Sequence, residues 1–121
     1  MGVQNRVTVL SETCQMADLL REHHIYVGKA GAATMFECYA SRVPVLVNFT
    51  LPGQEQGNLQ LLVSDGAGCH VESTTHLVDT IDRLLEGDAA GWQRLCQAMS
   101  AASRERGAER VAKAIFNKFG V

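Results

Sequence analysis

The sequence lacks the marks of several protein classes. Proline occurs only twice in 121 residues, and no low-complexity segment is present, while 46% of the residues are hydrophobic. The chain is therefore expected to bury a core as one domain and not to be disordered. No apolar run approaches the roughly 20 residues of a membrane-spanning helix. With 11 basic residues against 13 acidic ones, the net charge is -2, so we expect no nucleic-acid binding.

Cysteine is present, but its spacing is not that of a metal site. Cys14, Cys38, Cys69 and Cys96 are far apart, and no CxxC or CxxH pair occurs. We predict that they are small buried hydrophobic residues in a reducing compartment. The N-terminal residues also lack the charged and apolar regions of a signal peptide. These features predict a cytoplasmic location, and no carboxylate cluster calls for a metal or other cofactor.

Apolar periodicity predicts strands that alternate with helices. Strands are expected at residues 6–10, 25–27, 43–49 and 68–71, and helices at 14–22, 34–41 and from 59 to a turn at 65–66. The remainder is predicted to be helical, with breaks at Gly87 and Gly107. This order indicates an α/β fold with a mostly parallel sheet of about four strands and helices on both faces.

A turn of small residues joins one predicted strand to its helix. Residues 28–33 read Gly-Lys-Ala-Gly-Ala-Ala, and the helix is predicted to begin at Thr34. Small side chains let a ligand approach the backbone, and the free N–H groups at a helix N-terminus attract phosphate. A simple tight connection explains the turn equally well. Lys29 is then either a solvated side chain or a charge that faces a pyrophosphate.

Glu37 has two competing interpretations. Thr34 and Glu37 have the Thr-x-x-Glu spacing of a capping box, in which both side chains close the start of a helix. Alternatively, the Glu37 carboxylate accepts hydrogen bonds from ribose hydroxyls. The residues alone favour neither interpretation.

A second polar turn follows the next predicted strand. Residues 52–58 read Pro-Gly-Gln-Glu-Gln-Gly-Asn and place four amide or acid side chains within five positions. Such groups both donate to and accept from sugar hydroxyls, although an ordinary exposed turn is the alternative. Because ligands bind at the carboxyl ends of parallel strands, the two turns together indicate a nucleotide-sugar site.

The two turns resemble those in the C-terminal, donor-binding domain of two-domain (GT-B) UDP-sugar glycosyltransferases. The likeness is to monogalactosyldiacylglycerol synthases, processive diacylglycerol glucosyltransferases and the peptidoglycan UDP-N-acetylglucosamine transferase. Residues 29–37 look like the family's Lys/Arg-x-Gly-x-x-Thr-x-x-Glu signature, and residues 52–58 look like its PGQExGN element. The likeness covers roughly residues 5 to 118.

The resemblance implies a Rossmann-like fold and a role for each turn. The first turn would bind the diphosphate, and its residues are Lys29, Gly31, Ala32, Ala33 and Thr34. Glu37 would bind the ribose. The second turn would bind the hexose through Gln54, Glu55, Gln56 and Asn58. Residues 1–121 would then form a single, partial UDP-sugar donor-binding domain of an enzyme that transfers a hexose, with inversion, to a lipid or glycolipid.

Compared with the family pattern, the sequence is expected to begin at the third strand of the donor domain and to lack the acceptor-binding domain. The acceptor domain is expected to supply the catalytic base, so we expect no catalytic residue here and no transfer by this chain alone. An acceptor-binding domain or subunit would be the partner, with peripheral membrane association through it. The alternatives are the donor half of a split glycosyltransferase and a non-catalytic remnant that binds a nucleotide or protein. The strand at 25–27 would either pair unusually with residues 6–10 or have an unpaired edge, and an unpaired edge favours homo-oligomers.

Overall fold

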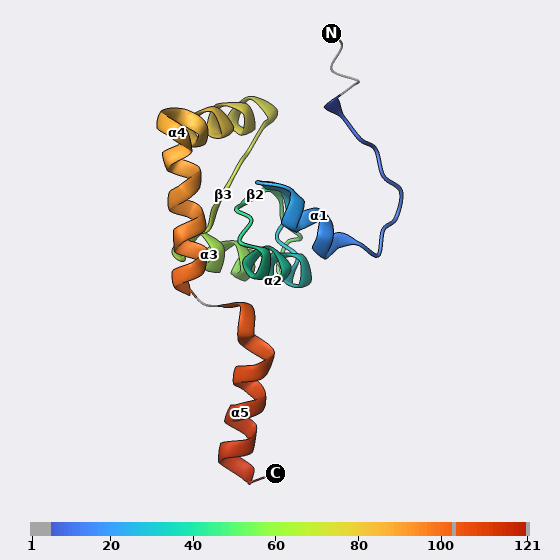
Figure 1. The fold of residues 1–121 in the computed structure, drawn as a ribbon, viewed down its shortest axis with the longest axis vertical. Helices are drawn as coiled ribbons and strands as arrows, with labels where there is room; N and C mark the ends of the chain where they lie inside the picture. The colour runs from blue at the N-terminus through green and yellow to red at the C-terminus, as the bar shows by residue number, and fades with distance from the viewer. Residues whose placement is uncertain (1–5, 103, 121) are drawn as a thin grey trace.

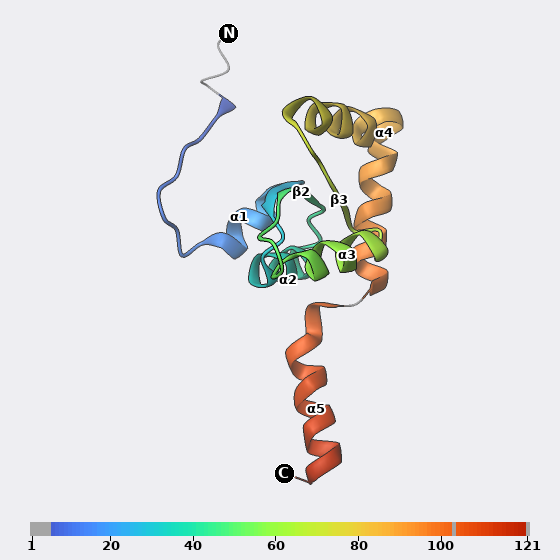
Figure 2. The same cartoon turned by 180° about the vertical axis from the view of Figure 1, so that it is seen from behind.

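The computed structural model describes residues 6–102 and 104–120, and its centre is a three-stranded parallel sheet (Figures 1 and 2). The strands lie in the order β1 (Tyr26–Lys29), β2 (Val45–Phe49) and β3 (Gly68–His70). Val27 pairs with Leu46, and Leu46 pairs with Cys69. The predicted α/β fold with a parallel sheet is confirmed.

Helices precede, separate and follow the strands. They are α1 (Met16–Glu22), α2 (Ala32–Ser41), α3 (Gln56–Ser64), α4 (Thr74–Ala102) and α5 (Gly107–Phe119), with a 3-10 turn η2 (Arg104–Arg106) before α5. In both views α2 and α3 lie on the same side of the sheet, and α5 extends away from it. No residue of α5 is buried.

The alternation of side chains along β2 divides the core into two faces. Val45 and Val47 join the apolar cluster that α2 and α3 form. Leu46, between them, points to the opposite face and is also fully buried. Its neighbour Cys69 lines a cavity there together with residues of α4, among them Leu84. Helices therefore cover both faces of the sheet, as predicted.

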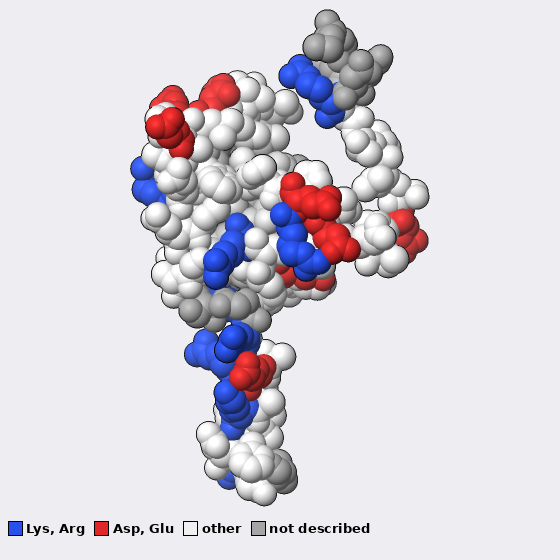
Figure 3. Space-filling view, viewed as in Figure 1, with Lys and Arg blue, Asp and Glu red and all other residues white. Residues whose placement is uncertain are grey.

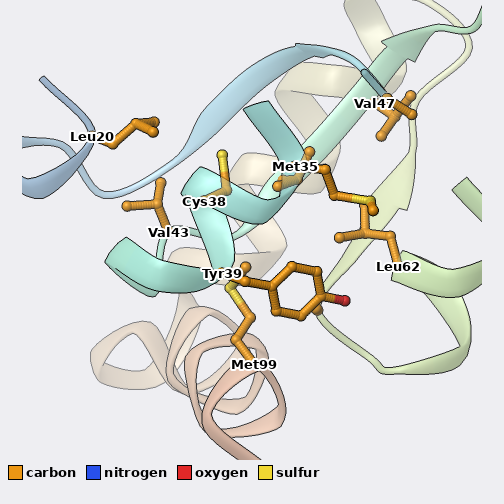
Figure 4. Close-up of a cluster of buried hydrophobic side chains, with 11 residues drawn as sticks. Leu20, Met35, Cys38, Tyr39, Val43, Val47, Leu62 and Met99 are labelled. Atoms are coloured by element: carbon orange, nitrogen blue, oxygen red, sulfur yellow. The ribbon is translucent and has the colours of Figure 1, made fainter. Parts of the chain in front are cut away.

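The cluster under α2 connects most elements of the chain. Figure 4 shows Met35 and Cys38 of α2 within it and Met99 of α4 beside Tyr39. All four side chains are at most 2% exposed, so each removes nearly its whole apolar surface from water. The end of α4 is thereby attached to the face that α2 and α3 cover.

The predicted strand at residues 6–10 is wrong. Residues 7–10 form neither helix nor strand, and Val7, Val9 and Leu10 are 58%, 88% and 56% exposed. Apolar alternation stabilises a strand only through packing and hydrogen bonds to a neighbouring strand. This segment has no such pairing in the structure. The described part of the sheet has three strands, where about four were expected.

Two glycines divide the helical C-terminal part, as predicted. The helical backbone of α4 is interrupted from Glu86 to Ala89, and Gly87 has a φ of 56°. Asp88 and Ala89 follow it into the left-handed region with φ of 57° and 59°. Gly107 is the first residue of α5. The C-terminal part is therefore two helices, the first of them sharply kinked.

Basic and acidic side chains are unevenly distributed along this part of the molecule. Figure 3 shows Lys and Arg side chains along α5. Arg110, Lys113 and Lys118 belong to this helix and are exposed. Acidic side chains gather instead over the first half of α4, where Asp79 and Asp82 are exposed. In the part of the chain that the structure describes, no helix is long and apolar enough to cross a membrane.

Candidate functional site

The two polar turns lie side by side at the carboxyl ends of β1 and β2. β1 ends at Lys29, and α2 begins three residues later. β2 ends at Phe49, and the second turn leads from there into α3. Because β1 and β2 are adjacent and parallel, both turns emerge at the same edge of the sheet. The expected meeting of the two turns is confirmed.

An ion pair between Lys29 and Glu55 connects the turns. Lys29 Nζ donates to Glu55 Oε1 over 3.2 Å, and the backbone N–H of Leu51 donates to Glu55 Oε2 over 2.9 Å. The Lys29 side chain is 55% exposed, whereas that of Glu55 is only 7% exposed. The Leu51 N–H and then Lys29 hold the pKa of Glu55 below its ordinary value. Glu55 is therefore a charged group inside the protein with both oxygens bonded.

Asn58 makes a second connection between the turns. Its Nδ2 donates to the carbonyl oxygen of Ala30 over 2.9 Å, and Ala30 is 1% exposed. Of the four side chains predicted to bind hexose, Glu55 and Asn58 thus hold the first turn in place. Gln54 in the second turn and Gln56 at the start of α3 are exposed. Hexose contacts by all four stay a prediction.

The helix after the glycine turn begins two residues earlier than predicted. Its N-cap is Gly31, and the first intrahelical bond runs from the Met35 N–H to the Gly31 carbonyl over 2.9 Å. The N–H groups of residues 32–34 precede that bond and point out of the helix end. Residues 32 and 33 are alanines, the best helix formers, which accounts for the earlier start.

The capping-box interpretation of Thr34 and Glu37 is therefore wrong. Thr34 is the third residue of α2 and not its N-cap, and no side chain caps this helix. Glu37 lies one turn further along and is exposed. That Glu37 binds ribose stays a prediction, and the capping box no longer offers an alternative role for this side chain.

Gly31 is not required by the backbone. Its φ of -67° suits any residue, and an added Cβ would lie 3.7 Å from both Glu55 Oε1 and Lys29 Cε, which is ordinary contact. At Gly68, in contrast, a Cβ would lie 2.0 Å from the Val45 carbonyl oxygen. Gly68 is thus needed for packing of the sheet. The space in front of Gly31 borders the helix N-terminus, the Lys29 ammonium and the Glu55 carboxylate.

The same edge of the sheet carries a cavity that the sequence did not predict. It measures about 230 Å³ and is lined by Asn48, Val71, Glu72, Ser73, Thr74 and Leu77, at the ends of β2 and β3 and the start of α4. Asn48 is the one polar residue in the apolar run 43–49. That interruption at a strand end was the signal available in the sequence.

A further polar cluster, which sequence reasoning also missed, ties α2 to the C-terminal part. The Tyr39 hydroxyl donates to Asp65 Oδ2 over 2.6 Å, and Arg104 pairs with both oxygens of Asp65, Nη2 to Oδ1 at 2.9 Å. Arg104 and then Tyr39 hold the pKa of Asp65 below its ordinary value, although burial opposes this. Burial and the bond to Asp65 raise the pKa of Tyr39. This cluster is structural, because all three groups are already paired.

The cysteines differ in their surroundings. Cys38 is fully buried, and burial raises the pKa of its thiol to about 12. Cys69 and Cys96 are half-buried, whereas Cys14 is exposed. The prediction of a buried hydrophobic role is therefore correct for Cys38 and wrong for Cys14, which lies before α1. Over residues 6–102 and 104–120, no group of three or more His, Cys, Asp or Glu side chains is placed to hold a metal ion.

Comparison with known proteins agrees with this geometry. Residues 2–115 match the Glycosyltransferase family 28 C-terminal domain. The chain belongs to this family. The family that the two turns indicated is thus confirmed, and a Rossmann-like fold is consistent with the parallel sheet described above.

Three relatives show what this family 28 domain is similar to. It is 33% identical over 106 residues to the UDP-N-acetylglucosamine--N-acetylmuramyl-(pentapeptide) pyrophosphoryl-undecaprenol N-acetylglucosamine transferase of Phenylobacterium zucineum, covering 83% of this chain and 29% of that protein. It is 29% identical over 84 residues to the processive diacylglycerol beta-glucosyltransferase of Staphylococcus carnosus, covering 69% of this chain and 22% of that protein. It is 30% identical over 71 residues to the probable monogalactosyldiacylglycerol synthase 3 of Oryza sativa subsp. japonica, covering 59% of this chain and 14% of that protein. The matches thus span less than a third of each relative's length.

Proposed function

We propose that this family 28 domain is the donor-binding portion of an inverting glycosyltransferase, which takes a hexose from a UDP-hexose and transfers it to a lipid or glycolipid hydroxyl. The observation that carries the proposal is the pairing of the two polar turns, through Lys29 with Glu55 and Asn58 with Ala30. The printed names of the relatives, which include a diacylglycerol glucosyltransferase and an N-acetylglucosamine transferase, support this chemistry.

The diphosphate would bind at the start of α2. The N–H groups of residues 32–34 point out of the helix end, and Gly31 leaves room for phosphate oxygens to approach them. Lys29 adds a positive charge beside this space. Glu37, exposed one turn into α2, is the acceptor available to the ribose hydroxyls.

The hexose would lie over the second turn. Gln54 and Gln56 offer exposed amides there, and Glu55 and Asn58 make the contacts between the two turns. In the reaction, the bond between the sugar and the UDP oxygen breaks as the acceptor hydroxyl attacks from the opposite face. The α2 N-terminus would stabilise the negative charge that develops on the departing UDP.

The acceptor hydroxyl must be deprotonated by a group from elsewhere. The matched segments cover 14% to 29% of the relatives named above, so an acceptor-binding domain or subunit is part of this proposal. Such a partner would bring the acceptor lipid to the donor site, in the cytoplasm at the membrane surface. Residues 1–121 would form the partial donor domain, without catalysis of transfer by themselves.

Calorimetric titration of the chain with UDP and ADP tests the proposal. We expect UDP to bind more tightly, and we expect Glu37→Ala to weaken UDP binding by roughly 1.5–3 kcal/mol through loss of charge-assisted hydrogen bonds. Because Glu37 does not cap α2, the thermal stability of this variant should stay close to that of the parent. Glu37→Gln should retain part of the affinity. Absence of UDP binding, or equal binding of ADP, would exclude the proposed function.

A further inference from the structure

The Lys29–Glu55 ion pair lies directly in front of Gly31. The position that a Cβ of Gly31 would take lies 3.7 Å from Glu55 Oε1 and 3.9 Å from Lys29 Nζ. The pair therefore borders the space beside the first amides of α2, where the proposed function places the diphosphate. A diphosphate that enters this space meets the ammonium and the carboxylate together.

The two partners differ in their freedom to move. Lys29 is 55% exposed and carries its charge on a flexible four-carbon chain. Glu55 is 7% exposed, and its Oε2 is fixed by the backbone N–H of Leu51 at 2.9 Å. Lys29 can thus turn toward an anion, while Glu55 is held where it is.

We propose that Lys29 leaves Glu55 for the diphosphate when the nucleotide binds, and that the released Oε1 of Glu55 then accepts a hydrogen bond from a hexose hydroxyl. This inference rests on the proposed function of the site. A diphosphate carries more negative charge than one carboxylate, so Lys29 binds the diphosphate in preference to Glu55. Glu55 loses a donor at a nearly buried position, where an unsatisfied carboxylate is costly.

The sugar hydroxyl restores that missing hydrogen bond. The exchange therefore couples the two halves of the ligand: the carboxylate is available to the sugar only after the diphosphate has engaged Lys29. A free hexose would find Glu55 Oε1 already occupied by Lys29. The site is thereby specific for a hexose attached to a diphosphate.

A double-mutant cycle with Glu55→Gln and Lys29→Met tests the exchange. Glutamine keeps the size of the side chain and can still accept from the Leu51 N–H. In the parent background, Glu55→Gln should strengthen UDP binding by roughly two- to fivefold, the scale of a half-exposed ion pair that no longer has to be broken. It should also reduce the preference for UDP-glucose or UDP-galactose over UDP.

In the Lys29→Met background, the gain from Glu55→Gln should be clearly smaller. An equal gain in UDP affinity in both backgrounds would mean that Glu55 merely repels phosphate. A loss of UDP affinity on Glu55→Gln in the parent background would mean that the ion pair persists in the complex. Either result overturns the inference alone. If the parent chain binds no UDP, the proposed function fails, and the inference fails with it.

Glu109→Gln serves as the matched control. Glu109 forms a lysine–glutamate pair with Lys113 on α5, at 2.8 Å and far along the chain from both turns. Its loss should leave UDP affinity unchanged. Thermal unfolding of every variant verifies that each one folds.

Discussion

Asn58 at the start of α3 donates a hydrogen bond to the carbonyl oxygen of Ala30, 28 residues earlier in the chain, over 2.9 Å. This bond satisfies a buried backbone acceptor between β1 and α2, because Ala30 is 1% exposed. The glycine turn is therefore positioned by a side chain from the second turn.

Replacement of Asn58 by Asp should damage the first turn more than replacement by Ala. The carboxylate would face the Ala30 carbonyl, so a hydrogen bond becomes a repulsion between two acceptors. We expect Asn58→Ala to lower the free energy of unfolding by roughly 1 kcal/mol and Asn58→Asp to lower it further. Chemical denaturation measures both values. Equal stability of the two variants would show that the bond does not hold the turn.

Gly31→Ala should weaken UDP binding without changing the stability of the fold. The backbone at Gly31 suits alanine, and the nearest atoms to an added Cβ lie 3.7 Å away, so the melting temperature should be nearly unchanged. The added methyl group would occupy space proposed for the diphosphate, and UDP binding should weaken at least tenfold, or about 1.4 kcal/mol.

Gly68→Ala is the matched control in the same chain. Its Cβ would lie 2.0 Å from the Val45 carbonyl oxygen, so this variant should fail to form the native sheet. Circular dichroism and calorimetry measure the two effects. A Gly31→Ala variant that binds UDP normally would contradict the placement of the diphosphate.

Asp65 should make stability depend on pH in the acid range. Its folded pKa is lowered by Arg104 and Tyr39, so its contribution is complete above the ordinary carboxyl pKa of about 3.9. As the pH falls from there through the lowered folded pKa, the contribution is lost. We expect Asp65→Asn to lower the free energy of unfolding at neutral pH by roughly 1–2 kcal/mol. In this variant the free energy of unfolding should also fall less steeply on the acid limb of its plot against pH.

Urea unfolding at a series of pH values measures this difference. Asp82→Asn, at an exposed position of α4, is the control and should leave the acid limb unchanged. An unchanged acid limb in Asp65→Asn would show that the cluster with Arg104 is not formed in solution.

The free edge of β1 should favour self-association. β1 is an outer strand of the sheet, and a groove of about 230 Å³ beside it is lined by apolar side chains, including Leu10, Met16, Ile25 and Val27. Exposed apolar edges recruit other chains. Light scattering over a concentration series should detect oligomers, and Val27→Lys should reduce them.

Ile115→Lys distinguishes this edge from the exposed apolar side chains of α5. Ile115 is 48% exposed on that helix. If Ile115→Lys alone abolishes association, α5 and not the edge of β1 is responsible. A parent chain that stays monomeric at high concentration would contradict the prediction as a whole.

The sequence determined the class of fold and the order of the helices and strands from α1 onward. The apolar run at 43–49 predicted a strand buried on both faces, and Val45 to Val47 of β2 are fully buried. Glycines marked the breaks in the C-terminal helices. The two motifs, with their spacing, determined the family. These are local signals, since each depends on residues a few positions apart.

The tertiary structure decided what depends on distant partners. Residues 6–10 have the pattern of a strand but lie exposed, because a strand requires a neighbour that the sequence cannot guarantee. The family resemblance assigned Glu55 and Asn58 to the hexose, yet their side chains bond to Lys29 and Ala30, 26 and 28 residues away. Such contacts form only when the sheet brings the two turns together, and no local spacing encodes them.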